Sequence, residues 1–110
     1  TLHLPLDKST QYILDSDNLS FLKNDAVLIN LARGGLIDEV ALKELLNNNK
    51  IAGAALDVFE IEPPVDPSFA TMDNVLITPH IGGSTEEAIL AMGMAAIEGL
   101  ENSKDPLNFL

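Results

Sequence analysis

The sequence predicts an α/β fold built around a parallel β-sheet. Three apolar segments, at residues 26–32, 52–59 and 74–80, have the composition of strands, and helical patterns flank them. None of the three alternates cleanly between apolar and polar residues, which is typical of strands buried on both faces of a parallel sheet. Strands that alternate with helices favour parallel pairing through right-handed crossovers.

The first elements are a strand end, a short helix and a complete strand. TLHLPL, at residues 1–6, is an alternating apolar stretch that we interpret as the end of a strand. A short helix is expected over residues 17–23. The run AVLINLA, at residues 26–32, is rich in β-branched side chains and forms the first complete strand.

Asp38 is placed to cap the next helix, which we expect over residues 38–49. Glu39 lies four residues before Lys43, a spacing that allows an ion pair along the helix. One face of this helix is apolar, formed by Leu42, Leu45 and Leu46. AGAALDVF, residues 52–59, then forms the second complete strand.

The run EIEPPVDPSF, residues 60–69, contains three prolines and predicts an irregular connection. NVLITPH, residues 74–80, forms the third strand. Ser84-Thr85-Glu86-Glu87 has the form of a capping box that opens a long helix towards Asn102. Because this helix is apolar nearly all round, we expect it to pack against another domain or subunit.

Composition excludes several classes of function. The 110 residues carry a net charge of −11 with six cationic side chains, which argues against nucleic acid and anionic membranes as partners. No apolar run approaches the roughly 20 residues of a membrane-spanning helix, and no export signal is visible. The absence of cysteine excludes disulfides, thiolate metal sites and cysteine nucleophiles, and it is compatible with a reducing cytoplasm.

The unusual polar residues follow the predicted strands. Arg33, the only arginine, comes directly after the first strand, Asp57 lies near the end of the second, and His80 ends the third. His3 and Pro5 finish the first segment. Ligands of open parallel sheets bind beyond the carboxyl ends of the strands, so we expect these residues to converge at one edge.

Each of these residues also has a purely structural interpretation. Arg33 is a candidate for a solvated surface residue, and Asp57 for an acceptor of backbone N–H groups. Together, however, arginine binds carboxylates and histidine exchanges protons near neutral pH. This set suits a carboxylate substrate with an adjacent alcohol or ketone, although the residues alone leave open a carboxylate-binding module without catalysis.

Four motifs, LPLDKST, NLARGGLIDEVAL, GAALDVFEIEP and ITPHIGGST, resemble the successive signatures of the D-isomer-specific 2-hydroxyacid dehydrogenases. They cover nearly the whole chain in order. STEEA resembles the D-3-phosphoglycerate dehydrogenase branch. The resemblance implies that residues 1–110 form the second half of a Rossmann-type, doubly wound parallel sheet with flanking helices. It also implies an NAD-dependent oxidoreductase acting on a D-2-hydroxyacid or 2-keto acid, cytoplasmic and homodimeric in the complete protein.

The resemblance assigns the catalytic group to Arg33, Glu62 and His80. His80 is the implied acid/base on the substrate C2 oxygen, Glu62 supports its imidazolium, and Arg33 holds the substrate carboxylate and carbonyl. Glu62, which precedes the proline, is implied rather than Glu60. The implied cofactor-binding residues are His3, Leu4, Pro5, Leu31, Ala32, Arg33, Asp57, His80, Gly82 and Gly83.

One family feature is absent from the chain. No GxGxxG loop occurs, nor the acidic residue that follows it onto the ribose, so NAD and NADP are not distinguished. We therefore expect the chain to lack the glycine-rich first half of the domain and most of the substrate domain. We interpret PLNFL, residues 106–110, as a remnant of the substrate domain. By itself the chain is expected to bind NAD weakly and to be inactive.

Three alternative functions compete with this assignment. The first is an NAD(H)-sensing interaction protein of the co-repressor type, which resembles this family without essential catalysis. A formate-type dehydrogenase is disfavoured, because those enzymes resemble this pattern with glutamine at the Glu62 position. A metal-dependent hydrolase is disfavoured because no histidine and carboxylate cluster has ligand spacing on one element.

Overall fold

The computed structural model describes residues 1–103 and divides the chain into two compact units, Thr1–His80 and Ile81–Leu110. The first unit contains the sheet and two of the three α-helices, and the second contains the last α-helix. The segment PLNFL, interpreted above as a remnant of a second domain, lies outside the described residues.

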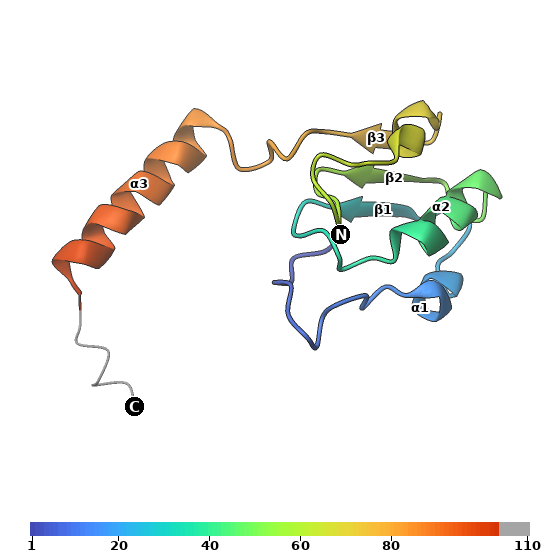
Figure 1. Ribbon diagram of the computed structural model, residues 1–110, viewed down its shortest axis with the longest axis horizontal. Coiled ribbons are helices and arrows are strands. Elements are labelled where there is room, and N and C mark those ends of the chain that lie inside the picture. The colour runs from blue at the N-terminus through green and yellow to red at the C-terminus, as the bar shows by residue number, and fades with distance from the viewer. Residues whose placement is uncertain (104–110) are drawn as a thin grey trace. The chain divides into compact units, whose positions relative to one another are not determined.

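The first unit is built on a three-stranded parallel sheet in the order β1-β2-β3. The strands are β1 (Val27–Asn30), β2 (Gly53–Leu56) and β3 (Val75–Ile77), and their arrows point the same way in Figure 1. This arrangement confirms the predicted parallel α/β fold. The strands are shorter than predicted, since β2 ends before Asp57 and β3 before Thr78.

The first six residues do not form a strand. Leu2 makes an isolated parallel bridge to Asn30, and its N–H donates to the carbonyl of Ile29 at 3.0 Å. The predicted strand end is therefore reduced to one bridge, which nevertheless holds the N-terminal segment beside the carboxyl end of β1.

Two helices precede β2, and both begin at an aspartate cap. Helix α1 (Ser16–Ser20) is capped by Asp15 and is shorter than predicted. Helix α2 (Glu39–Asn47) is capped by Asp38, whose carboxylate accepts from the backbone N–H groups of Val40 and Ala41 at 3.0 Å each. The predicted Asp38 cap is confirmed. It satisfies two of the N–H groups that the first turn of a helix leaves without internal partners.

The connection between β2 and β3 contains a helical element that was not predicted. A 3₁₀ helix, η1 (Pro67–Thr71), is capped by the carboxylate of Asp66, which accepts from the N–H of Ser68. Proline is well suited to the first turn of a helix because its missing N–H would have no helical partner there. The interpretation of residues 60–69 as wholly irregular was therefore wrong at its end.

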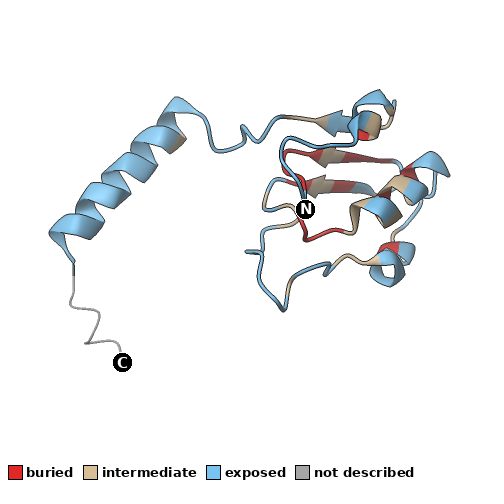
Figure 2. Cartoon of the chain, in the orientation of Figure 1, coloured by how far each residue is buried: buried red, intermediate tan, exposed pale blue. Residues whose placement is uncertain are grey.

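The core lies on one face of the sheet. Leu28 of β1 and Leu56 of β2 are buried against side chains of the two helices and of η1, which include Leu19, Leu42, Leu46 and Phe69. Figure 2 shows buried positions along β1 and β2 and in the segment that leads into α2. On the other face, Val27 is 57% exposed and Leu76 is 66% exposed. The expected burial on both faces is thus met on one face only among the described residues.

The second unit contains α3 (Glu86–Glu101), which is capped by Thr85 through the N–H of Ala88 at 3.1 Å. The predicted capping box beginning at Ser84 was therefore wrong by one residue. No residue of α3 is buried. Its packing against another domain or subunit remains a prediction. Among residues 1–103, no helix has the length and apolar character that a membrane span requires.

Gly34 allows two distant segments to meet through their backbones. A Cβ atom on Gly34 would lie 1.9 Å from the carbonyl oxygen of Phe59 and 2.7 Å from the nitrogen of Glu60. Any side chain at this position would overlap backbone atoms, which have little room to move. Glycine therefore holds the segment after β1 directly against the beginning of the connection after β2.

We expect Gly34→Ala to lower the free energy of unfolding by roughly 1–3 kcal/mol, because the added methyl group must push these two backbone segments apart. The measurement is urea unfolding followed by circular dichroism. Gly99→Ala in α3 is the matched control, since a Cβ there meets nothing within 4 Å. Equal unfolding free energies for wild type and Gly34→Ala would contradict the close approach.

Candidate active site

The candidate site lies at the edge of the sheet where all three strands end. The register pairs Asn30 with Leu56 and Leu56 with Ile77, so these positions form one row across the sheet. Arg33 follows this row after β1, and Asp57 follows it directly after β2. His80 comes three residues after Ile77.

Asn30 shapes the turn that carries Arg33. Its side chain is buried, its amide Nδ2 donates to the carbonyl of Arg33 at 2.9 Å, and its Oδ1 accepts from the N–H of Ala32 at 3.1 Å. A buried amide with both ends hydrogen-bonded fixes the local backbone. Asn30 was not predicted as a site residue, although a polar side chain inside the apolar run AVLINLA was a signal for it.

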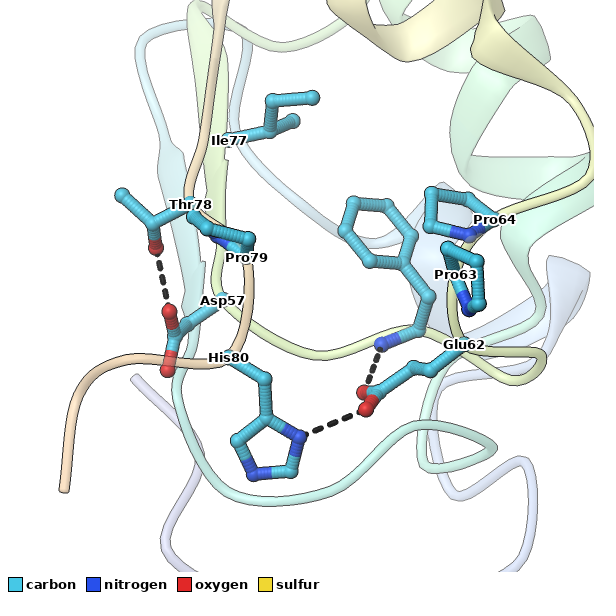
Figure 3. Close-up of a pocket in the computed structure, with 9 residues that line it drawn as sticks. Asp57, Glu62, Pro63, Pro64, Ile77, Thr78, Pro79 and His80 are labelled. Carbon is cyan, nitrogen blue, oxygen red and sulfur yellow. Dashed lines mark hydrogen bonds and ion pairs between the residues drawn. The ribbon is translucent and has the colours of Figure 1, made fainter. Parts of the chain in front are cut away.

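A pocket of about 480 Å³ opens at this edge beside β3. Figure 3 shows that Asp57, Glu62 and His80, all predicted site residues, line the same pocket although they come from separate segments. The remaining lining residues are mostly apolar and were not predicted: Phe59, Pro63, Pro64, Ile77, Thr78 and Pro79.

His80 and Glu62 are in direct contact. The imidazole Nδ1 lies 2.6 Å from Oε2 of Glu62, and the other carboxylate oxygen, Oε1, accepts from the backbone N–H of Phe59 at 2.9 Å (Figure 3). The side chains of His80 and Glu62 are 50% and 35% exposed, respectively. Glu62 is therefore held at both oxygens while the imidazole remains accessible to a ligand.

The backbone of His80 has an uncommon conformation, with φ at 54°. Residues other than glycine rarely adopt left-handed backbone angles, and such conformations cluster at functional sites. Its N–H donates to the carbonyl of Thr78 at 3.1 Å, so the chain turns tightly just before the imidazole.

The two acidic residues that sequence reasoning alone left open have different partners. The hydrogen bond from His80, followed by that from the Phe59 N–H, lowers the pKa of Glu62 below its ordinary value. Glu60 instead accepts a hydrogen bond from the hydroxyl of Tyr12. The contact with His80 thus distinguishes Glu62, the glutamate that the resemblance implied, from Glu60.

Asp57 is buried, with 2% of its surface exposed. Its carboxylate accepts a hydrogen bond from the hydroxyl of Thr78, and both residues lie directly beyond their strands. Burial of a carboxylate is costly unless hydrogen bonds compensate it, so this contact explains part of its stability there. Thr78 was not predicted, although it lies two residues before His80 in the same motif.

A second pocket of about 330 Å³ brings together the other predicted residues of the first unit. It is lined by Leu2, His3, Leu4, Pro5, Leu31, Ala32 and Arg33. The Leu2 bridge to β1 explains how residues near 3 and near 32 come to share one pocket. The convergence of His3, Leu4 and Pro5 with Leu31 and Ala32 was expected from the resemblance.

Arg33 lines this second pocket rather than the pocket of Glu62 and His80. It is exposed, and its Nη1 donates to the carbonyl of Ala32 at 2.7 Å. Gly82 and Gly83 belong to the second unit and are exposed. Among residues 1–103, no group of three or more histidine or acidic side chains is arranged to hold a metal ion.

Known proteins match this chain over most of its length. D-3-phosphoglycerate dehydrogenases of Methanocaldococcus jannaschii and Bacillus subtilis are 50% and 52% identical over 92% and 82% of the chain, respectively. The chain spans only 19% and 17% of those relatives. A glyoxylate reductase structure from Paecilomyes thermophila superimposes with a TM-score of 0.86 at 37% identity, covering 93% of this chain and 31% of that one.

The two matched relatives support the resemblance to the D-3-phosphoglycerate dehydrogenase branch, and the superposition supports the Rossmann-like fold. The model of one family also matches residues 1–82, which include both pockets. The chain therefore belongs to the D-isomer specific 2-hydroxyacid dehydrogenase family and contains part of its NAD binding domain.

Proposed function

We propose that the complete protein containing this chain transfers a hydride between NAD and a D-2-hydroxyacid or its 2-keto acid. The observation that carries the proposal is the 2.6 Å contact between His80 Nδ1 and Glu62 at the rim of an apolar pocket. D-3-phosphoglycerate is the substrate we favour, because both relatives at 50% identity or more described above carry that name.

The two pockets fit the two ends of a dinucleotide. Both lie at the carboxyl edge of the sheet, where α/β folds bind such ligands. The pocket beside β3 offers apolar walls for a flat ring, next to the buried carboxylate of Asp57. The pocket near His3 offers leucine and proline surfaces for the adenosine half. When bound, the cofactor supplies the hydride donor or acceptor.

His80 is proposed to move the proton. Because the pKa of Glu62 lies below its ordinary value, its carboxylate is ionised near neutral pH and only accepts hydrogen bonds. Nδ1 must therefore donate, which leaves Nε2 to give a proton to the substrate C2 oxygen during reduction or to remove it during oxidation. The carboxylate also stabilises the imidazolium form in which Nε2 carries that proton.

Arg33 is proposed to bind the substrate carboxylate and the adjacent carbonyl through parallel hydrogen bonds. Its guanidinium contacts the carbonyl of Ala32 and lines the neighbouring pocket. Two facts support a role for Arg33 in binding the substrate. The side chain is exposed, and the next residue, Gly34, lies against Phe59, whose N–H binds Glu62. A substrate carboxylate is a better acceptor than the Ala32 carbonyl, because it is charged.

We also infer that the complete protein is a cytoplasmic homodimer. The absence of cysteine in the chain supports a reducing compartment. The apolar side chains of α3, including Leu90 at 67% exposed, support a surface that another subunit covers. The nucleotide-sensing alternative gains no support from the relatives described above, which are named as dehydrogenases or a reductase.

His80→Ala in the complete protein should lower kcat for reduction of the 2-keto acid by about 10²–10⁴-fold, the usual contribution of a general acid. The dissociation constant for NADH, measured by fluorescence titration, is the control and should change by about tenfold or less, a free-energy change of about 1.4 kcal/mol, because His80 is one of several residues that line the cofactor pocket. Unchanged turnover would contradict the proton-transfer role. Loss of both turnover and NADH binding would indicate a collapsed site instead.

Arg33→Lys should raise KM for the 2-keto acid by about tenfold or more, because lysine keeps the charge but loses the two parallel hydrogen bonds. Steady-state kinetics with saturating NADH measure this effect. Lys23→Arg, a swap of the same two residue types at an exposed position, is the control and should leave KM unchanged. An unaltered KM in Arg33→Lys would remove Arg33 from the substrate site.

The Glu62 contact should also affect stability in a pH-dependent way. A carboxylate with a lowered pKa in the folded state adds stability above its ordinary pKa of 4.5, and this is lost as pH falls through the folded value. The difference in unfolding free energy between wild type and Glu62→Gln should therefore be larger at pH 6 than at pH 3. Urea titrations across this range give the difference. A constant difference would show that the ionised carboxylate is not responsible.

A further inference from the structure

The contact between Glu62 and His80 depends on a segment with little burial of its own. We call residues 59–66 the Glu62 loop. Its first residue, Phe59, is buried, whereas residues 60–66 are all exposed. Acid–base groups must be held close to their productive geometry to be efficient, and exposed loops do not provide this by packing. Other contacts must therefore fix the loop.

Glu39, the first residue of α2, provides such a contact. Its Oε1 accepts from the backbone N–H of Glu60 at 2.6 Å. The helix does not need Glu39 as a cap, because Asp38 already accepts from two N–H groups of the first turn. The side chain of Glu39 reaches across to the loop instead, and it binds the residue adjacent to Phe59, whose N–H binds Glu62.

A second residue of α2 contacts the far end of the same loop. The ammonium group of Lys43 pairs with Asp66 and lies 5.0 Å from the ring centroid of Phe69. Glu39 and Lys43 are one helical turn apart, a spacing that also permits a pair between them. In the structure, Glu39 instead accepts from the N–H of Glu60 and Lys43 pairs with Asp66. Side chains of α2 therefore contact both ends of the Glu62 loop.

The position of Glu39 has an electrostatic cost. Burial raises the pKa of its carboxyl group above the ordinary value, and the nearby charges of Glu60 and Glu62 act in the same direction. The hydrogen bond from the Glu60 N–H and the positive charge of Lys43 oppose this rise in the pKa of Glu39. A glutamate at the start of α2 that faced solvent would avoid the cost of partial burial. The hydrogen bond to the Glu62 loop compensates part of this cost.

We propose that Glu39 is a positioning residue for the reaction. By holding the Glu60 N–H, it fixes the Glu62 loop so that the Glu62 carboxylate meets Nδ1 of His80. Glu39 touches neither His80 nor the candidate substrate pocket by this contact, and it acts through the loop backbone. The inference rests on the proposed function, because it concerns the orientation of Glu62 relative to His80 in the proposed acid–base pair.

The test is a double-mutant cycle in the complete protein, with kcat for 2-keto acid reduction as the readout. Glu39→Ala should lower kcat by about tenfold, the effect of losing one hydrogen bond to a charged acceptor. Glu39→Gln keeps an oxygen acceptor for the Glu60 N–H and should stay within about threefold of wild type. Glu44→Ala, which removes an exposed glutamate from the same helix, is the matched control and should behave as wild type.

The decisive comparison is Glu39→Ala in a Glu62→Gln background. If Glu39 acts by aiming Glu62, its removal should cost little once that carboxylate is gone, so the two losses should not multiply. Multiplicative losses would overturn the proposal, because they would show that Glu39 acts independently of Glu62. An equal loss of kcat in Glu39→Gln and Glu39→Ala would overturn it as well, since the acceptor would then not matter.

A second measurement separates this inference from the proposed function. Hydrogen–deuterium exchange of the Glu60 amide should accelerate by about tenfold in Glu39→Ala and remain slow in Glu39→Gln and Glu44→Ala, whether or not the protein turns over. Unchanged exchange in Glu39→Ala would overturn the anchoring contact itself. If wild type shows no turnover at all but exchange responds as expected, the proposed function fails while the anchor stands.

Discussion

The parallel register of the sheet is the constraint on which the site depends. Pairing of Asn30 with Leu56, and of Leu56 with Ile77, brings three strand ends into one row. The polar residues that follow this row are separated by more than twenty positions in sequence, yet they share an edge. A shift of one residue between β2 and β3 would turn every side chain of one strand to the other face. The contact of Asp57 with Thr78 would then be lost, and His80 would move relative to Glu62.

Beyond the strand ends, the site is held by backbone contacts rather than by a deep core. Gly34 lies against the Phe59 carbonyl, Asn30 fixes the turn before it, and the N–H of Phe59 binds Glu62. These contacts link the segment after β1 to the segment after β2. Such links restrain loops whose side chains must stay exposed to meet a ligand. They also explain the presence of Gly34 and Asn30 next to the site, since both residues shape the backbone that carries it.

The sequence pattern predicted those features that depend on residues close together in the chain. The strands, the Asp38 cap and the helix that follows depend on neighbouring residues, and the order of motifs named the glutamate that meets His80. The 3₁₀ helix η1 was not predicted. The Thr85 cap was not predicted either, because a cap one residue earlier, at Ser84, satisfies the same sequence pattern. Nor did the sequence predict the partner of Glu39, since helical spacing pointed to Lys43 whereas the structure places Glu39 on the Glu60 backbone. Contacts between distant segments leave no periodic signal.

The acidic side chains at this edge give a physical reason for the role proposed for Arg33. Glu60 and Glu62 act electrostatically on Glu39, and the buried Asp57 lines the same pocket as Glu62. Ionised carboxylates at this edge repel an anionic substrate. The carboxylate substrate proposed above would therefore need a cation that does not lose its proton, and Arg33, the only arginine in the chain, follows the end of β1 at this edge. The acidic side chains beside the proposed acid–base pair thus give a physical reason for an arginine in the proposed substrate site.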